Sequence, residues 1–194
     1  MSVSKKENSI IRLCAKIAKC TDCSLHEART NTVTGAGTVD TKIMFIGEAP
    51  GKKEDEQGRP FIGRAGDIFS SLLASVGITR DDIYLCNTLK CRPPKNRNPA
   101  GEETIACAKH LDAQIKIINP EVIGTLGQYS TNYVFKKFDI PLEKITKVAG
   151  QIIEVETKFG LKKIVPVFHP AVAIYNVHRT DELMAHFQVF KQFK

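Results

Sequence analysis

The chain has 194 residues, of which 42% are hydrophobic and 25% charged, and it carries a net charge of +7 with a pI near 9.1. This length suffices for one domain with a buried core. No apolar run approaches the roughly 18 residues of a membrane helix, and Lys16 and Lys19 interrupt the apolar pattern of the N-terminus, which is unlike a signal peptide. We therefore expect a cytoplasmic protein without a membrane partner, and the basic charge favours a polyanion such as nucleic acid.

The first half of the chain has apolar patterns typical of alternating helices and strands. Residues 7–19 carry an apolar stripe at helical spacing, and residues 24–40 are expected to form a loop. The short apolar run at 43–46 predicts a strand that is buried on both faces. It breaks in the sequence GEAPG at 47–51, where proline and glycine favour a turn, and a helix is expected from about Asp67.

The second half continues the same alternation. The expected elements are strands over residues 83–90, 122–127, 152–156 and 164–168, and helices over 102–118, 128–138 and from about Thr180. The stretch RPPKNRNPAG at 92–101 is predicted to be a basic loop because its three prolines exclude a helix or a central strand. The pattern indicates an α/β fold: a three-layer α/β/α sandwich with a central, mostly parallel four-stranded sheet, in a single domain over residues 1–194.

Polar residues follow three of the expected strands. Glu48 comes after the first, Asn87 stands at the end of the second and His169 follows the last. Because the carboxyl ends of parallel strands share one edge of a sheet, these side chains are expected to face one crevice. The alternative is three independent loop residues, and a lone histidine at such a place is more often structural.

Four of the six cysteines form a pattern of their own. Cys20 and Cys23 are two residues of one turn, and Cys91 and Cys107 flank the basic loop and the start of the next helix. In an apparently cytosolic chain such cysteines favour metal or redox chemistry over disulfides. Four thiolates can hold a zinc ion or an iron–sulfur cubane, and the spacing alone does not decide between them. The other two cysteines fit ordinary buried thiols.

Three motifs, preceded by CTDC, occur in a specific order over about residues 15–175: GEAPGKKEDEQGRPFIGRAG, CNTLKCRPPKNRNP and HPA. With this set the chain resembles the family 4 uracil-DNA glycosylases, the iron–sulfur type found in thermophilic archaea and bacteria. The resemblance implies an α/β/α sandwich and a monofunctional DNA repair enzyme that removes uracil without a diffusible cofactor. It also implies a [4Fe-4S] cluster, structural in role, on Cys20, Cys23, Cys91 and Cys107.

The residues make chemical sense of uracil recognition. The Asn87 amide can accept a hydrogen bond from uracil N3–H and donate one to O4. Cytosine reverses both groups, so a fixed amide would reject it by leaving buried polar atoms unpaired. Phe61 is expected to stack on the base, although a core role is common for phenylalanine. The base must first be flipped out of the duplex.

Cleavage of the N1–C1′ bond requires a site for the leaving uracil anion and a positioned water. His169 is expected to donate a hydrogen bond to uracil O2, and backbone amides between Gly47 and Ala49 can assist. Glu48 is the first candidate for positioning the water. Glu54 is the second, or it guards the space at uracil C5 where thymine carries a methyl group. Ala49 stands where family 1 enzymes use an aspartate, which leaves the residue that activates the water open.

The expected partner is uracil-containing DNA, single- or double-stranded, bound by a nucleoid-associated monomer with possible replication or repair partners. The segment 170–175, ending in Tyr175, is the candidate wedge that replaces the flipped base, and a plain helix-entry loop is the alternative. The candidate phosphate contacts are Arg92, Lys95, Arg97 and Arg179. For any one of them, an ordinary solvated surface charge is nearly as good an interpretation.

Three other functions deserve comparison. A family 5 glycosylase with broader base specificity is the nearest, and the GEAPGKKE loop and Asn87 favour family 4 over it. A non-catalytic nucleic-acid-binding module with a four-cysteine metal site fits the charge, but it leaves the three polar strand-end residues without a role. Phosphate binding at the GEAPG turn is disfavoured by the two neighbouring acids and by the absence of a P-loop lysine–hydroxyl pair.

Overall fold

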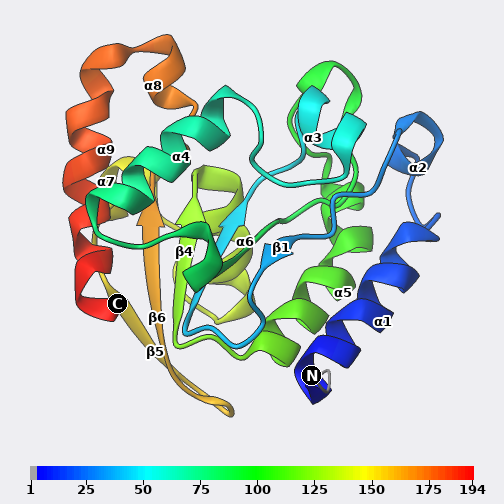
Figure 1. The fold of residues 1–194 in the computed structure, drawn as a ribbon, viewed down its shortest axis with the longest axis horizontal. Coiled ribbons are helices and arrows are strands. Elements are labelled where there is room, and N and C mark those ends of the chain that lie inside the picture. The colour runs from blue at the N-terminus through cyan, green and yellow to red at the C-terminus, as the bar shows by residue number, and fades with distance from the viewer. Residues whose placement is uncertain (1–3) are drawn as a thin grey trace.

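The computed structural model describes residues 4–194, and in this part of the chain a six-stranded sheet lies between two layers of helices (Figure 1). The strands are β1 (Ala36–Gly37), β2 (Ile43–Gly47), β3 (Ile83–Asn87), β4 (Val122–Leu126), β5 (Ile153–Thr157) and β6 (Gly160–Val167). Their order across the sheet is β1-β3-β2-β4-β6-β5. The inner four strands are parallel, which confirms the α/β/α sandwich with a mostly parallel sheet.

The expectation of four strands is wrong, because an antiparallel strand is added at each edge of the parallel set. β1 pairs with β3 and spans only two residues, too few for an apolar alternation to show in the sequence. It lies inside the segment 24–40 that was expected to be a loop. At the other edge, β5 pairs with β6 in an antiparallel hairpin, and strands were expected in both segments, at 152–156 and 164–168.

Helices cover both faces of the sheet (Figure 1). The α-helices of the described residues are α1 (Lys5–Ala18), α2 (Leu25–Ala28), α3 (Lys52–Gln57), α4 (Arg64–Ser75), α5 (Gly101–Ile118), α6 (Gln128–Lys137), α7 (Ile145–Val148), α8 (Val172–Tyr175) and α9 (Thr180–Phe187). Short 3-10 helices span Arg80–Asp82, Pro94–Asn96, Val177–Arg179 and Gln188–Phe193. Within residues 4–194, every helix is too short or too polar to span a lipid bilayer.

The core lies on both faces of the central strands, because side chains alternate along each strand. On β2, Ile43 and Phe45 belong to the apolar cluster under α4 and α9. Met44 and Ile46 belong to the cluster under α1, α5 and α6. All residues of β2, β3 and β4 are buried, as expected of parallel strands with helices on both sides.

The segment between β2 and α4 is more ordered than its sequence indicates. It contains the short helix α3, which ends at Gly58 in a left-handed conformation with φ +68°. The buried Asp55 carboxylate accepts hydrogen bonds from the backbone amides of Thr30 and Asn31, and so fixes α3 to the N-terminal segment. The helix expected from Asp67 begins three residues earlier, at Arg64.

Candidate active site

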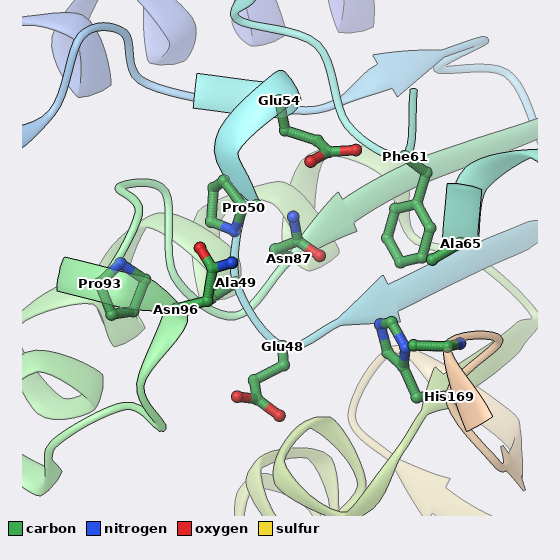
Figure 2. Close-up of a pocket in the computed structure, with 12 residues that line it drawn as sticks. Glu48, Ala49, Pro50, Glu54, Phe61, Ala65, Asn87, Pro93, Asn96 and His169 are labelled. Carbon is green, nitrogen blue, oxygen red and sulfur yellow. The ribbon is translucent and has the colours of Figure 1, made fainter. Parts of the chain in front are cut away.

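A cavity of about 330 Å³ opens at the carboxyl ends of the parallel strands (Figure 2). Glu48, Asn87 and His169 all line it, so the three polar residues that follow different strands do meet in one crevice. The complete lining consists of Glu48, Ala49, Pro50, Gly51, Glu54, Phe61, Ala65, Asn87, Pro93, Asn96, His169 and Ala171. The cavity is therefore built mainly from the GEAPG loop, the end of β3, the basic loop and the segment after β6.

Asn87 is the most informative residue of this cavity. Its side chain is only 1% exposed, and its Oδ1 atom has no hydrogen-bond donor among residues 4–194. Gly47 lies opposite it in the β2–β3 register, and a Cβ atom at Gly47 would stand 2.4 Å from Asn87 Oδ1. Because buried acceptors normally have a donor, this oxygen is suited to an N–H group of a ligand.

Phe61 forms the wall beside Asn87, in a conformation that other residues hold in place. Its φ is 52°, in the left-handed region that is unfavourable for a phenylalanine. Arg80 Nη2 donates a 2.6 Å hydrogen bond to the Phe61 carbonyl oxygen and a second one to the Gly66 carbonyl oxygen. A Cβ atom at Gly66 would lie 1.9 Å from the Phe61 oxygen, so glycine is required there. Sequence reasoning missed Arg80, because nothing in its own segment relates it to the cavity.

His169 lies next to Phe61, with ring centroids 5.7 Å apart. Its Nδ1 atom accepts a 3.2 Å hydrogen bond from the Ala171 backbone amide, which places the proton of the neutral ring on Nε2. Burial lowers the pKa of His169 to about 4, although the nearby Glu54 carboxylate offsets part of that shift. At neutral pH the ring is therefore an uncharged hydrogen-bond donor.

The two acids of the cavity have different surroundings. Glu54 Oε1 accepts hydrogen bonds from the backbone amides of Ile62 and Gly63, both at 2.9 Å, just before α4 begins. Glu48 is half-buried, and burial raises the pKa of its carboxyl group. In Figure 2 the Glu48 carboxyl group points away from Asn87 and Phe61. Glu54 thus shapes the loop that carries Phe61, whereas Glu48 is the more available of the two for a water molecule.

A second, smaller cavity lies between the C-terminal end of α1, α5 and the segment that follows β3. All four cysteines of the sequence pattern line it: Cys20, Cys23, Cys91 and Cys107. Arg29 Nη1 lies 3.3 Å from the Cys91 sulfur as a donor, a contact that suits a thiolate. Convergence of four soft sulfur donors on one cavity fits a four-thiolate iron–sulfur or zinc site.

A mixed ligand set exists at the edge of the same cavity. The ligand atoms of Cys20, Asp22 and His110 lie within 4.8 Å of one another, and His110 Nε2 is 3.2 Å from the Cys20 sulfur. Carboxylate and imidazole favour other metals than the pure thiolate set does. Cys20 belongs to both sets, so only one of them can be occupied at a time.

Comparison with known proteins identifies the family. The model of the uracil DNA glycosylase superfamily matches residues 34–191. The chain belongs to this superfamily. A type-4 uracil-DNA glycosylase of Thermotoga maritima is 48% identical over 168 residues, covering 87% of this chain and 83% of the relative. One of Archaeoglobus fulgidus is 41% identical over 174 residues, covering 89% and 87%.

The type-5 relatives are more distant. A type-5 uracil-DNA glycosylase of Pyrobaculum aerophilum is 29% identical over 165 residues, covering 77% of this chain and 70% of the relative. Within the uracil DNA glycosylase superfamily, the chain is therefore a type-4 member. This confirms the resemblance drawn from the sequence motifs.

In this glycosylase the basic loop forms part of the rim of the cavity, since Pro93 and Asn96 line it. Arg92 Nε donates a hydrogen bond to Asn96 Oδ1, and Lys95 is exposed. Arg97, by contrast, makes two hydrogen bonds with the buried Glu103 carboxylate at the start of α5. This ion pair attaches the basic loop to α5. Because the Arg97 guanidinium is engaged in it, Arg97 is less available for a phosphate group than Arg92 and Lys95.

The segment after His169 carries the other expected DNA contacts. Tyr175, at the end of α8, is 89% exposed, which suits a side chain that inserts into DNA. Arg179 forms an ion pair with Glu182 and lies over the Phe168 ring at 4.2 Å from its centroid. Arg179 is consequently partly engaged within the protein, and Tyr175 is the freer of the two.

Proposed function

We propose that this type-4 member excises uracil from DNA by hydrolysing the N-glycosidic bond, which leaves an abasic site. The observation that carries this proposal is the buried and unpartnered amide oxygen of Asn87, a residue that lines the cavity of about 330 Å³ at the strand ends, which has room for a flipped base. The names of the type-4 relatives at 48% and 41% identity support it independently.

Asn87 reads the base. Its Oδ1 accepts a hydrogen bond from uracil N3–H, and its amide nitrogen donates to O4. Cytosine presents an acceptor at N3 and a donor at C4, so both contacts fail and two buried groups lose their partners. Phe61 stacks on the face of the base, and Gly47 leaves room for both side chains.

The bond between uracil N1 and C1′ breaks with its electron pair leaving on the base, so negative charge develops on uracil O2. His169, neutral and protonated on Nε2, donates a hydrogen bond to that oxygen, and the backbone amides from Gly47 to Ala49 add to this stabilisation. A water attacks C1′ and releases a proton. Glu48 positions this water and is the first candidate to accept the proton, while Glu54 holds the Phe61 loop.

DNA contacts surround the opening of the cavity. Lys95 and Arg92 on the basic loop bind phosphates, and Arg179 contributes from the other side. Tyr175 fills the gap left by the flipped nucleotide. Its DNA substrate places the enzyme at the nucleoid in the cytoplasm, and we expect it to act as a monomer because its sequence has no evident interface signature.

The four-cysteine cavity holds a [4Fe-4S] cluster. Cys20 and Cys23 follow α1, Cys91 immediately precedes the basic loop and Cys107 lies on α5, so a bound cluster would connect three segments covalently. We assign the cluster a structural role because the cysteine cavity and the cavity that contains Asn87 share no lining residue.

The test uses labelled oligonucleotides that differ only at one position, which holds uracil, cytosine, thymine or hypoxanthine. Each is incubated with the protein and then treated with alkali, which breaks the strand at an abasic site. Strand breaks confined to uracil support the proposal. Breaks at hypoxanthine would favour the broader type-5 specificity, and DNA binding with no break at any base would favour a non-catalytic module.

A further inference from the structure

Lys90 is one of the most deeply buried side chains of the protein, with an exposed fraction of 1%. Its Nζ atom donates a 2.5 Å hydrogen bond to the backbone carbonyl oxygen of Asn87 and a 2.6 Å hydrogen bond to Gln114 Oε1. The ammonium group thus holds the peptide unit of the residue that reads the base.

Gln114 is itself fixed, so it keeps Lys90 in place. Gln114 Nε2 donates to the Thr34 carbonyl oxygen and to the Tyr84 hydroxyl group, which turns its Oε1 toward Lys90. The backbone of Lys90 is also held, because its carbonyl oxygen accepts a hydrogen bond from the Val33 amide. Lys90 therefore has one defined position between Gln114 and Asn87.

Among residues 4–194 Lys90 forms no ion pair: its hydrogen-bond acceptors are the Asn87 carbonyl oxygen, the Gln114 amide oxygen and the buried Cys86 thiol. An ammonium group buried among neutral groups is costly, and a nearby negative charge offsets that cost. Lys90 lines the same cavity as Cys20, Cys23, Cys91 and Cys107. Four thiolates with a bound cluster carry net negative charge, which is the missing compensation.

We propose that Lys90 is a positioning residue that couples the loaded cysteine cavity to base recognition by Asn87. A bound cluster would place negative charge beside Lys90, and the Lys90 Nζ atom holds the Asn87 carbonyl oxygen and, through the backbone, the orientation of the Asn87 side chain. This inference rests on the proposed uracil specificity and assigns Lys90 no contact with the substrate.

Lys90→Met tests the inference, with Lys162→Met as a matched control. Lys162 is also buried, at 4% exposed, and donates to Asn119 Oδ1, but it stands on β6 in the lining of a third cavity. Two quantities are measured on each purified protein: iron bound per chain, and the calorimetric affinity of the iron-loaded fraction for free uracil. Loss of the hydrogen bond from the Lys90 ammonium group to the Asn87 carbonyl oxygen predicts about tenfold weaker uracil binding in Lys90→Met.

The expected result is lower iron content and about tenfold weaker uracil binding for Lys90→Met, with neither change in Lys162→Met. Unchanged iron content or unchanged uracil affinity in Lys90→Met overturns the inference, because the coupling requires that Lys90 affect both cluster retention and uracil binding. If Lys90→Met does not fold, the coupling is tested on the wild-type protein by measuring its uracil affinity with and without iron. Removal of its iron with a chelator must weaken uracil binding, and equal affinity with and without iron overturns the coupling.

Failure of the proposed function would be visible separately. The wild-type protein is assayed on the uracil-containing oligonucleotide in the same series. If it makes no uracil-dependent break, the proposed function fails before the role of Lys90 is in question. If it makes the break and Lys90→Met matches it in iron content and uracil affinity, only the inference about Lys90 fails.

Discussion

Arg80 holds Phe61 in place through the backbone: its guanidinium donates a 2.6 Å hydrogen bond to the Phe61 carbonyl oxygen. Phe61 has a φ of 52°, a conformation that is unfavourable unless neighbouring groups impose it. The same guanidinium also donates to Ser70 Oγ and to the Gly66 carbonyl oxygen. The placement of the stacking ring thus depends on a residue 19 positions away in the chain.

Replacement of Arg80 with methionine is expected to weaken catalysis, although Arg80 acts on the base only through Phe61. The Phe61 carbonyl oxygen loses the Arg80 donor, and the Gly66 carbonyl oxygen loses one donor but keeps Ser70 Oγ, so Phe61 can relax toward an ordinary φ and leave the face of the base. We expect kcat/KM on a uracil-containing oligonucleotide to fall about tenfold or more, together with a lower Tm. Arg64→Met, at an exposed position on α4, is the control. An Arg80→Met enzyme with wild-type kcat/KM would contradict this role.

Two substitutions of Glu54 separate a loop-holding role from a catalytic one. Glu54→Gln keeps an oxygen that can accept from the Ile62 and Gly63 amides, whereas Glu54→Ala removes it. We expect Glu54→Gln to stay within about threefold of the wild-type kcat and Glu54→Ala to lose about tenfold. Single-turnover kinetics on the uracil substrate measure both. A large loss in Glu54→Gln would instead show that the negative charge takes part in the reaction.

Gly47→Ala is expected to block the cavity without unfolding the protein. The added Cβ atom would stand 2.4 Å from Asn87 Oδ1 and 2.7 Å from the Phe61 ring, so both side chains must move. We expect at least about a hundredfold loss of uracil excision, because base reading and stacking are disturbed together. Gly101→Ala is the control, since a Cβ atom there meets nothing within 4 Å. Near-normal excision by Gly47→Ala would mean that the base binds elsewhere.

The free energy of unfolding is expected to decrease as the pH is lowered, over a range that is set by the pKa of His169. Burial lowers the pKa of His169 to about 4, whereas the unfolded chain takes up the proton near 6.5. Between these values only the unfolded state binds the proton, so stability decreases as pH falls from about 6.5 to about 4 and is unaffected above that range. Denaturant unfolding of the wild type and His169→Gln measures this. Identical pH slopes for the two proteins would contradict the shift.

The sequence predicts the parallel core and the convergence of strand-end residues well, because apolar runs and strand polarity follow from local pattern. It does not predict β1, whose two residues pair through the backbone alone, or α3, whose sequence KKEDEQ has no apolar face. The support of Phe61 by Arg80 was also out of reach, since it depends on tertiary contact between segments.

Charge pattern was a weaker guide than strand ends. Arg97 was expected to contact phosphate because it is a cation in a basic loop, yet it is paired with Glu103. Lys90, next to Cys91, is buried, although a lysine is normally expected at the surface. Both cases have one cause: whether a cation faces solvent depends on partners that lie far along the chain or across the fold.

The most direct measurement is the excision of uracil and of cytosine from otherwise identical oligonucleotides by the wild type and by Asn87→Asp. An ionised aspartate offers only acceptors, so it loses the donor to uracil O4 and repels that oxygen. We expect uracil excision to fall at least about a hundredfold in Asn87→Asp, and the ratio of uracil to cytosine excision to fall with it. An Asn87→Asp enzyme that keeps the wild-type ratio would show that another residue reads the base.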